Sequence, residues 1–184
     1  MSASLANHSG MDPPTRQQSD EDIRRRVAAV EQRLGMGSPR VLVHVDPDPN
    51  TVGGWADASQ SWAIEGIPYR GLITLTRGLV DGLSAPELDA VIAHELTHVR
   101  RCHYTGHPPE SRDEIRRYAI KAELAADLGV LDAGLKPEDL RDALEHVRQL
   151  LAAGASPGRS SPAYPSIPER AERLRSEQRI RALH

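Results

Sequence analysis

Residues 84–103 read SAPELDAVIAHELTHVRRCH, and this stretch predicts the central helix of the fold. Ser84 and Glu87 form a capping box, and Pro86 between them is typical of a first helical turn. Apolar residues then recur three and four positions apart, as on the buried face of a helix: Leu88, Val91, Ile92, Leu96 and Val99. We therefore expect a helix that starts after Ser84 and packs one face against the core.

The sequence on either side of this helix predicts an α+β protein. Short β-branched or alternating runs precede it and predict a small N-terminal sheet: residues 41–45, 61–64 and 71–76. Helical spacing with start and stop signals predicts further helices: residues 19–34, 111–134, 137–153 and a charged stretch after 168. Residues 1–18 are polar and lack periodicity, which predicts a disordered tail before a single domain of residues 19–184.

The composition disfavours several classes of partner. The net charge is −3 and aromatic residues make up 3% of the chain, so neither a basic field nor stacking platforms for nucleic acid are expected. No run approaches the roughly 20 apolar residues of a membrane span, so membrane insertion is not expected. One cysteine and no secretory signal at the N-terminus indicate a reducing compartment. The sequence thus predicts a soluble, cytoplasmic protein and leaves its oligomeric state open.

Inside the central helix, His94 to His98 fit the pattern H-E-x-x-H. A helix advances about 100° per residue, so the two histidines lie about 40° apart on one face and can bind one metal ion. Glu95 is rotated about 100° from His94, which suits a base for a metal-bound water better than a ligand. The pattern predicts a catalytic zinc site, which needs a third protein ligand and an open position.

Several residues compete for the third position. His103 lies about 180° from His94 if the helix continues, so we expect it to point away and to serve in the core or behind a ligand. Four side chains in or near the following loop would have to fold back to reach the ion: His107, Glu110, Asp113 and Glu114. We favour Glu123, because a carboxylate on a second helix can approach the first helix across a contact of small residues.

Asp127 lies one helical turn beyond Glu123, where its carboxylate can accept the spare N–H of a ligating imidazole. Residues 122, 125 and 126 are alanines and supply the small-residue contact. An acidic, solvated face of an amphipathic helix would also explain Glu123 and Asp127. From these residues alone, that simpler explanation is favoured.

Two segments together resemble the CAAX prenyl protease and HtpX-like zinc peptidases. Residues 71–103, GLITLTRGLVDGLSAPELDAVIAHELTHVRRCH, resemble that family's passage from a substrate-binding edge strand into its zinc helix, including the histidine at 103. Residues 122–144, AELAADLGVLDAGLKPEDLRDAL, are similar to its glutamate helix. The resemblance implies a zincin-like fold with one zinc ion per chain.

By residue, the resemblance implies zinc ligation by His94, His98 and Glu123. It implies general base catalysis by Glu95, and support from the second shell of the metal by Asp127 and His103. Typical members carry transmembrane helices around this core, whereas residues 99–122 here are polar and charged. The chain therefore looks like a soluble, minimal member of the gluzincin type.

A second departure lies in AYPSIPERAERLR, residues 163–175, which resembles a late segment where the family has a His-Pro pair before an Arg-containing helix. Tyr164 occupies the place of that histidine. The resemblance assigns this position to stabilising the oxyanion, and a phenol can donate the same hydrogen bond. We interpret the Arg-rich stretch from Arg170 to Arg181 as a salt-bridged, solvated helix, because glutamates are interleaved with its arginines.

The function expected is a zinc-dependent endopeptidase acting on peptide or protein substrates. A substrate would add as a β-strand to an edge strand at residues 71–76, which places four residues in the binding cleft: Ile73, Thr74, Leu75 and Thr76. The alternative is a zinc-containing latent or inactive peptidase-like protein that binds or regulates a partner. Glu95 favours the enzyme, because a structural zinc site needs no base beside the metal.

Overall fold

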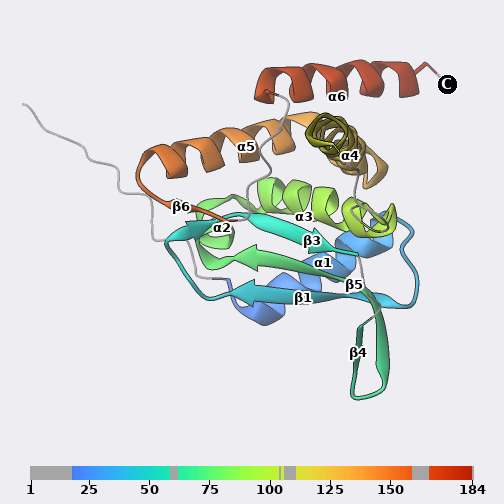
Figure 1. Ribbon diagram of the computed structural model, residues 1–184, viewed down its shortest axis with the longest axis vertical. Coiled ribbons are helices and arrows are strands. Elements are labelled where there is room, and N and C mark those ends of the chain that lie inside the picture. The colour runs from blue at the N-terminus through green and yellow to red at the C-terminus, as the bar shows by residue number, and fades with distance from the viewer. Residues whose placement is uncertain (1–17, 59–61, 104, 106–110, 159–165, 184) are drawn as a thin grey trace, which may run out of the picture.

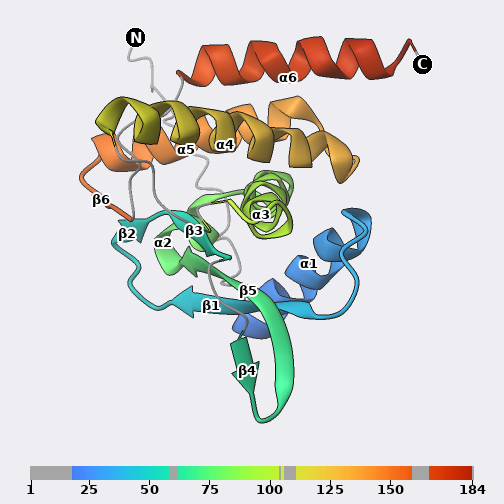
Figure 2. The same ribbon diagram turned by 45° about the vertical axis from the view of Figure 1, so that its right-hand side comes forward.

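Helix α3 (Ala85–Arg100) runs between a small β-sheet and a layer of C-terminal helices (Figures 1 and 2). The computed structural model describes residues 18–58, 62–103, 105, 111–158 and 166–183. The sheet lies on one side of α3, helices α4 and α5 on the other, and α6 lies over α4 and α5 (Figure 2). All but the last residue of the predicted N-terminal tail lies outside the described residues.

The helices match the predicted ranges closely. They are α1 (Asp20–Arg33), α4 (Arg112–Asp132), α5 (Pro137–Ala152) and α6 (Ile167–Arg181), with a short α2 (Arg77–Gly82) that the sequence did not predict. Serine capping boxes begin α1, α3, α4 and α6, as their sequences indicate. In α3, the Ser84 N–H donates to Glu87 at 2.8 Å.

The main sheet has the strand order β1-β5-β3, and β4 pairs with β5 as a hairpin. Its members are β1 (Arg40–Asp46), β3 (Gly54–Asp57), β4 (Trp62–Ile64) and β5 (Ile67–Thr76). Strand β1 is parallel to β5, whereas β3 and β4 are antiparallel to it. A separate pair joins β2 (Thr51–Val52) to β6 (Ser156–Pro157) in parallel.

The prediction that residues 71–76 form an edge strand is wrong. They lie in β5, the central strand, where Ile73 pairs with Val43 of β1 on one side and with Ala56 of β3 on the other. The main chain of Ile73, Thr74 and Leu75 is thus paired in the sheet on both sides. An edge strand would leave one row of its N–H and C=O groups unpaired, whereas both rows of this strand are used. Its two faces are buried as well, since Thr74, Leu75 and Thr76 are all buried.

The outermost strand beside the C-terminal helices is β3, among the residues that the structure describes. The sequence did not predict it. Its four residues, Gly-Trp-Ala-Asp, lack the β-branched run that marks strands, and a second glycine precedes them. The pairing with β5 therefore forms the strand, and local propensity contributes little.

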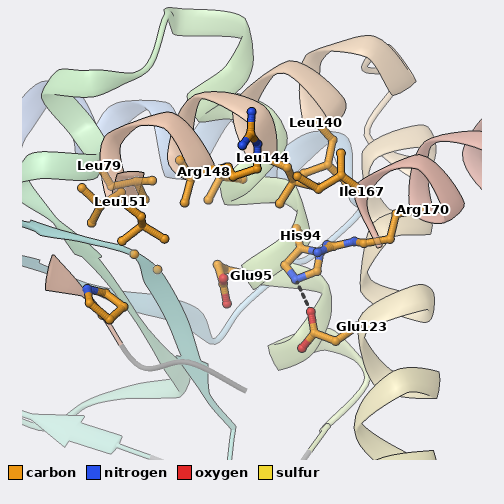
Figure 3. Close-up of a pocket in the computed structure, with 17 residues that line it drawn as sticks. Leu79, His94, Glu95, Glu123, Leu140, Leu144, Arg148, Leu151, Ile167 and Arg170 are labelled. Carbon is orange, nitrogen blue, oxygen red and sulfur yellow. Dashed lines mark ion pairs between the residues drawn. The ribbon is translucent and has the colours of Figure 1, made fainter. Parts of the chain in front are cut away.

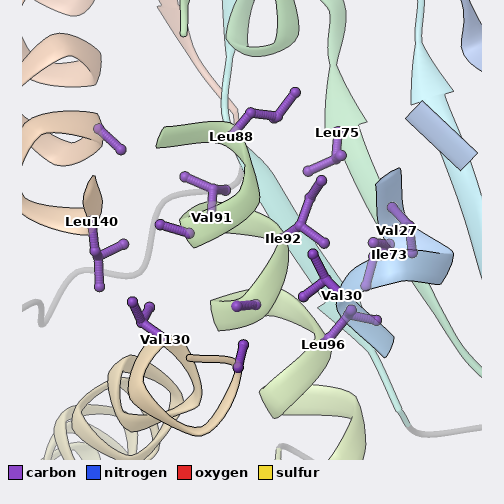
Figure 4. Packing of buried hydrophobic residues seen from close by; sticks show 14 of the residues in the cluster. Val27, Val30, Ile73, Leu75, Leu88, Val91, Ile92, Leu96, Val130 and Leu140 are labelled. Carbon is purple, nitrogen blue, oxygen red and sulfur yellow. The ribbon is translucent and has the colours of Figure 1, made fainter. Parts of the chain in front are cut away.

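The core surrounds α3 on every side. Leu88, Ile92 and Leu96 are fully buried, and α1 contributes Val27 and Val30 to the same cluster (Figure 4). Each such side chain contributes about 1.5–3 kcal/mol of burial free energy. On the other side of α3, Val130 of α4 and Leu140 of α5 complete the cluster. Because α3 is packed on both sides, its polar side chains have fixed positions.

The observed architecture confirms the predicted mixed α+β class, with a small sheet and a helical C-terminal part. Within the described part of the chain, no helix combines the length and the apolar character needed to cross a membrane.

Candidate metal centre and active site

A close crossing of α3 and α4 brings the site together. At Gly129 the two helices approach so closely that a Cβ atom there would lie 1.9 Å from Thr97 Oγ1 and 2.9 Å from the Ala93 carbonyl. Glycine is therefore required at this contact. Two and six residues earlier on α4, the side chains of Asp127 and Glu123 are directed at α3, and both are buried.

Three donors converge between the helices, namely His94, His98 and Glu123. Figure 3 shows the first and the last of them. The Nε2 atoms of His94 and His98 lie 3.1 Å apart, and Glu123 places one carboxylate oxygen 3.2 Å from the first and the other 3.6 Å from the second. In a tetrahedral zinc site with bonds of about 2.0–2.1 Å, ligand atoms lie about 3.3 Å from one another. These residues thus fit a zinc ion in both donor type and spacing.

The other ring nitrogen of each histidine has its own partner. His94 Nδ1 donates to Asp127 at 3.0 Å, and His98 Nδ1 lies 2.9 Å from His103 Nδ1. These contacts orient both rings so that their Nε2 atoms face the cluster, which is the usual arrangement behind metal-bound histidines. The structure therefore places Asp127 and His103 directly behind the two candidate ligands.

His103 reaches this place because α3 ends earlier than the sequence indicated. Cys102 adopts a left-handed backbone conformation with φ of 50°, the Cys102 N–H donates to Val99, and the His103 N–H donates to His98. This bonding closes the helix with a Schellman motif, and the chain folds back. The expectation that His103 points away was wrong, because it assumed a continuing helix.

Arg170 of α6 is a site residue that the sequence analysis missed. It donates from Nε to Asp127 Oδ2 at 2.9 Å and from a terminal nitrogen to Asp127 Oδ1 at 2.5 Å, and it is only 5% exposed. The interpretation of residues 170–181 as a solvated helix is wrong at this position. The available signal was the resemblance of residues 163–175 to a segment with an arginine in its helix.

Burial, hydrogen bonds and nearby charges shift the pKa values of Asp127, His94 and His98. Burial would raise the pKa of Asp127, but hydrogen bonds from His94 and Arg170 outweigh it and lower that pKa to about 2. Burial opposes a charge on His94, but hydrogen bonds to Asp127 and Glu123 raise its pKa to about 10. Burial and the charge of His94 lower the pKa of His98 to about 3. Without metal, the cluster thus holds a proton that a divalent ion would displace.

Glu95 stands apart from the three donors. It lies against β3, where a Cβ atom on Gly54 would be 3.4 Å from Glu95 Oε1. Burial, with the negative charge of Glu123 adding to it and the charge of His94 opposing it, raises the pKa of Glu95 to about 7. A carboxyl group with this pKa can both accept and release a proton near neutrality.

His94, Glu123 and Glu95 line a cavity of about 340 Å³ that runs under α5 (Figure 3). Among the other predicted candidates, Asp113 is exposed and Glu114 caps the first turn of α4, so neither belongs to the cluster. Tyr164, His107 and Glu110 lie outside the described residues.

Comparison with known proteins assigns the chain to a family. Residues 17–107, about half of the chain, match the model of peptidase family M48. The chain belongs to peptidase family M48. M48 proteins are zinc metallopeptidases. The matched residues end before α4, so the family match does not include Glu123, Asp127 or Arg170.

Similar proteins carry the name protease HtpX. A protease HtpX homolog of Dictyoglomus turgidum is 26% identical over 132 residues, covering 72% of this chain and 36% of that protein. A homolog of Listeria monocytogenes is 36% identical over 74 residues, 40% of this chain and 21% of that protein. Protease HtpX of Idiomarina loihiensis is 30% identical over 82 residues, which cover 45% of this chain and 25% of that protein. No solved structure matches the chain significantly.

The M48 chain spans about a third or less of the length of these relatives. The relatives also correct one expectation. Proteases of the HtpX group are membrane-bound, which contradicts the predicted cytoplasmic location.

Proposed function

We propose that this M48 chain is a zinc-dependent endopeptidase of the gluzincin type, with a zincin-like arrangement of its sheet and two helices. The observation that carries the proposal is the convergence of His94, His98 and Glu123 with Glu95 beside them and outside the donor set. A structural zinc site would close its fourth position with a protein ligand and would have no use for Glu95. Here the cluster opens into the cavity instead.

In this proposal the side chains of the site have three roles: metal ligation, orientation of a ligand and proton transfer. His94, His98 and Glu123 would hold the ion, while Asp127 and Arg170 keep the His94 ring in place. A zinc ion held there, when bound, lowers the pKa of a water ligand and polarises the scissile carbonyl. Glu95 accepts the proton of the attacking water and passes it to the leaving amine, a role that its pKa of about 7 suits.

Strand β3 replaces residues 73–76 as the proposed substrate-binding strand. Thr76 N–H donates to the Gly53 carbonyl, so residues 53, 55 and 57 face β5. Neighbouring residues of a strand direct their N–H and C=O groups to opposite sides, so those of Gly54 and Ala56 face away from β5. A peptide can add to β3 there through main-chain hydrogen bonds, with its scissile bond beside Glu95.

Glu95→Gln tests the proposal, because it removes the base and leaves all three donors. We expect the wild type to bind one zinc per chain by mass spectrometry and to cleave casein in a chelator-sensitive way. Glu95→Gln should retain the zinc and lose at least about 100-fold in cleavage rate. Glu177→Gln, at the far end of α6, is the matched control and should behave as wild type.

Two results would contradict the proposal. Cleavage by Glu95→Gln at the wild-type rate would exclude Glu95 as the base. Stoichiometric zinc in a wild type that cleaves neither casein nor a broad peptide library would instead favour the alternative, a zinc-containing protein that binds peptides without hydrolysing them.

A further inference from the structure

Trp55 lies on the face of β3 that points away from the candidate metal centre. Side chains alternate between the two faces of a strand, and the neighbouring Gly54 faces α3, because a Cβ atom there would lie 3.4 Å from Glu95 Oε1. Trp55 pairs with Thr74 of β5, so these two side chains share the face of the sheet opposite α3. Trp55 is accordingly not among the residues that line the cavity beside Glu95.

The indole ring of Trp55 is supported on one side and partly open on the rest. Gly158, the residue after β6, packs beside it, since a Cβ atom there would lie 3.5 Å from the ring atom Cζ3. Trp55 is only half-buried, so the remainder of the ring presents apolar surface to solvent. Such a surface on an outer strand is stabilised when a neighbouring apolar side chain covers it.

A peptide paired with β3 would place one side chain directly beside this ring. The main chain of Trp55 is directed at β5, whereas Gly54 and Ala56 offer theirs to a peptide on the outer edge. The peptide residue opposite Trp55 therefore forms a non-hydrogen-bonded pair with it. In such pairs the Cα atoms lie about 4.5 Å apart, and the two side chains stand close together on one face.

Strand pairing also determines where this peptide residue lies relative to the cut. Antiparallel pairs are the more common and the more stable per residue, and a peptide antiparallel to β3 runs from the Asp57 end toward the Gly54 end. Strand β6 is paired with β2 beyond that end, so main-chain pairing of the peptide stops at Gly54, beside Glu95. The peptide residue opposite Gly54 then precedes the scissile bond, and the residue opposite Trp55 is the second before it.

We propose that Trp55 is a specificity-determining residue that selects a bulky apolar side chain, β-branched or aromatic, at the second residue before the scissile bond. Cross-strand pairs of an aromatic residue with a β-branched or aromatic one are more stable than pairs of small residues, and a small polar side chain would leave the ring uncovered. This inference rests on the proposed function, and it names the substrate class of that site.

Cleavage-site mapping tests the preference. Casein is digested with the metal-loaded full chain, and the new termini are identified by mass spectrometry. We expect valine, isoleucine and aromatic residues at the second position before the cut at about two to five times their frequency in casein. Cleavage without enrichment at this position overturns the inference while leaving the peptidase proposal intact.

A variant connects the preference to the ring, because Trp55→Thr removes the indole and keeps a residue that favours strands. Two peptides are compared that differ only in isoleucine or serine at the second position before the cut. The wild type should favour isoleucine about two- to fivefold in kcat/KM, and Trp55→Thr should bring this ratio close to one. Leu72→Thr, at a half-buried leucine on the same face of the central strand, is the matched control and should keep the ratio. An unchanged ratio in Trp55→Thr would contradict the assignment.

Fluorescence tests the contact without catalysis. The chain has two tryptophans, so Trp62→Phe leaves Trp55 as the single indole. In the zinc-loaded double variant with Glu95→Gln, the isoleucine peptide should shift the Trp55 emission to shorter wavelength, because the peptide excludes water from the ring. The serine peptide at the same concentration should shift it less.

Two outcomes of the titration separate this inference from the proposed function. If the emission responds to neither peptide, or equally to both, Trp55 does not select this side chain and the inference is wrong, whatever the chain's activity. A selective shift in the double variant, together with a wild type that cleaves neither peptide, would support the contact and overturn the peptidase proposal.

Discussion

At the scale of single residues, Asp127 stands between His94 and Arg170 and accepts hydrogen bonds from both. All three side chains are buried, so each depends on the others for its hydrogen bonds and its charge balance. Breaking a buried ion pair by removing one partner costs about 3–5 kcal/mol, since the remaining charge is left uncompensated. Arg170 thus acts on the candidate metal site through Asp127, without being part of the donor set.

Arg170→Gln should weaken zinc binding about 10- to 100-fold, because the Asp127 carboxylate that orients the His94 ring loses its charged hydrogen-bond partner. Competition with a chromogenic chelator measures the affinity. Arg173→Gln, an exposed arginine on the same helix, is the control and should bind zinc as wild type. Unchanged affinity in Arg170→Gln would show that Asp127 holds the His94 ring without this support.

The lowered pKa of Asp127 also predicts how stability depends on pH. Without metal, its stabilising contribution is present above its ordinary pKa of 3.8 and is lost as the pH falls toward 2, because only the unfolded state takes up the proton in that range. The shift corresponds to about 2 kcal/mol. Urea unfolding of the metal-free chain at pH 5 and pH 2.5 should show a larger drop for wild type than for Asp127→Asn. Equal drops would contradict this assignment.

At the scale of elements, the spacing of α3 and α4 controls the donor cluster. Gly129→Ala would place a methyl group 1.9 Å from Thr97 Oγ1, so α4 must move away and carry Glu123 and Asp127 with it. We expect a loss of about 1–3 kcal/mol in the free energy of unfolding, together with weaker zinc binding. Thermal unfolding and chelator competition measure the two effects.

Gly37→Ala is the matched control for this crossing, because a Cβ atom at Gly37 meets nothing within 4 Å. Normal zinc affinity in a destabilised Gly129→Ala would mean that the cluster tolerates displacement of α4, contrary to the geometry.

At the scale of the whole molecule, Asp132 links three helices. Near the C-terminal end of α4, it binds Arg100 of α3 and Arg181 of α6, the latter at 2.9 Å. Burial would raise the pKa of Asp132, but these two arginines lower it. The contact secures the end of α6 that lies opposite Arg170, so it supports the helix that delivers Arg170 to the site.

Asp132→Asn should loosen α6 while costing no more than about 1 kcal/mol in global stability, because the pairs are partly exposed. Hydrogen exchange should then be faster for the amides of α6 and unchanged in α3. Glu172→Gln, which alters a pair within α6, provides the comparison. If the amides of α6 exchange at the same rate in wild type and in Asp132→Asn, apolar contacts alone hold α6 in place.

The sequence by itself determined the central helix, the H-E-x-x-H face and the helix starts. These features depend on interactions between residues three or four positions apart, which the order of residues states directly. The pairing of that helix with Glu123 and Asp127 came from resemblance, since an acidic helix face looks the same whether it meets metal or water. Tyr164 remains a prediction outside the described residues.

Only the tertiary structure decided which strand lies at the edge, how His103 returns to His98, and that Arg170 lies against Asp127 behind His94. Each of these depends on contacts between segments far apart in the chain. Strand β3 has a low β-propensity and forms at the edge of the sheet because it pairs with β5. Arg170 stands among glutamates in the sequence, yet it is buried because Asp127, far away in the chain, accepts its hydrogen bonds. Local periodicity carries no information about such partners, because packing alone brings them together.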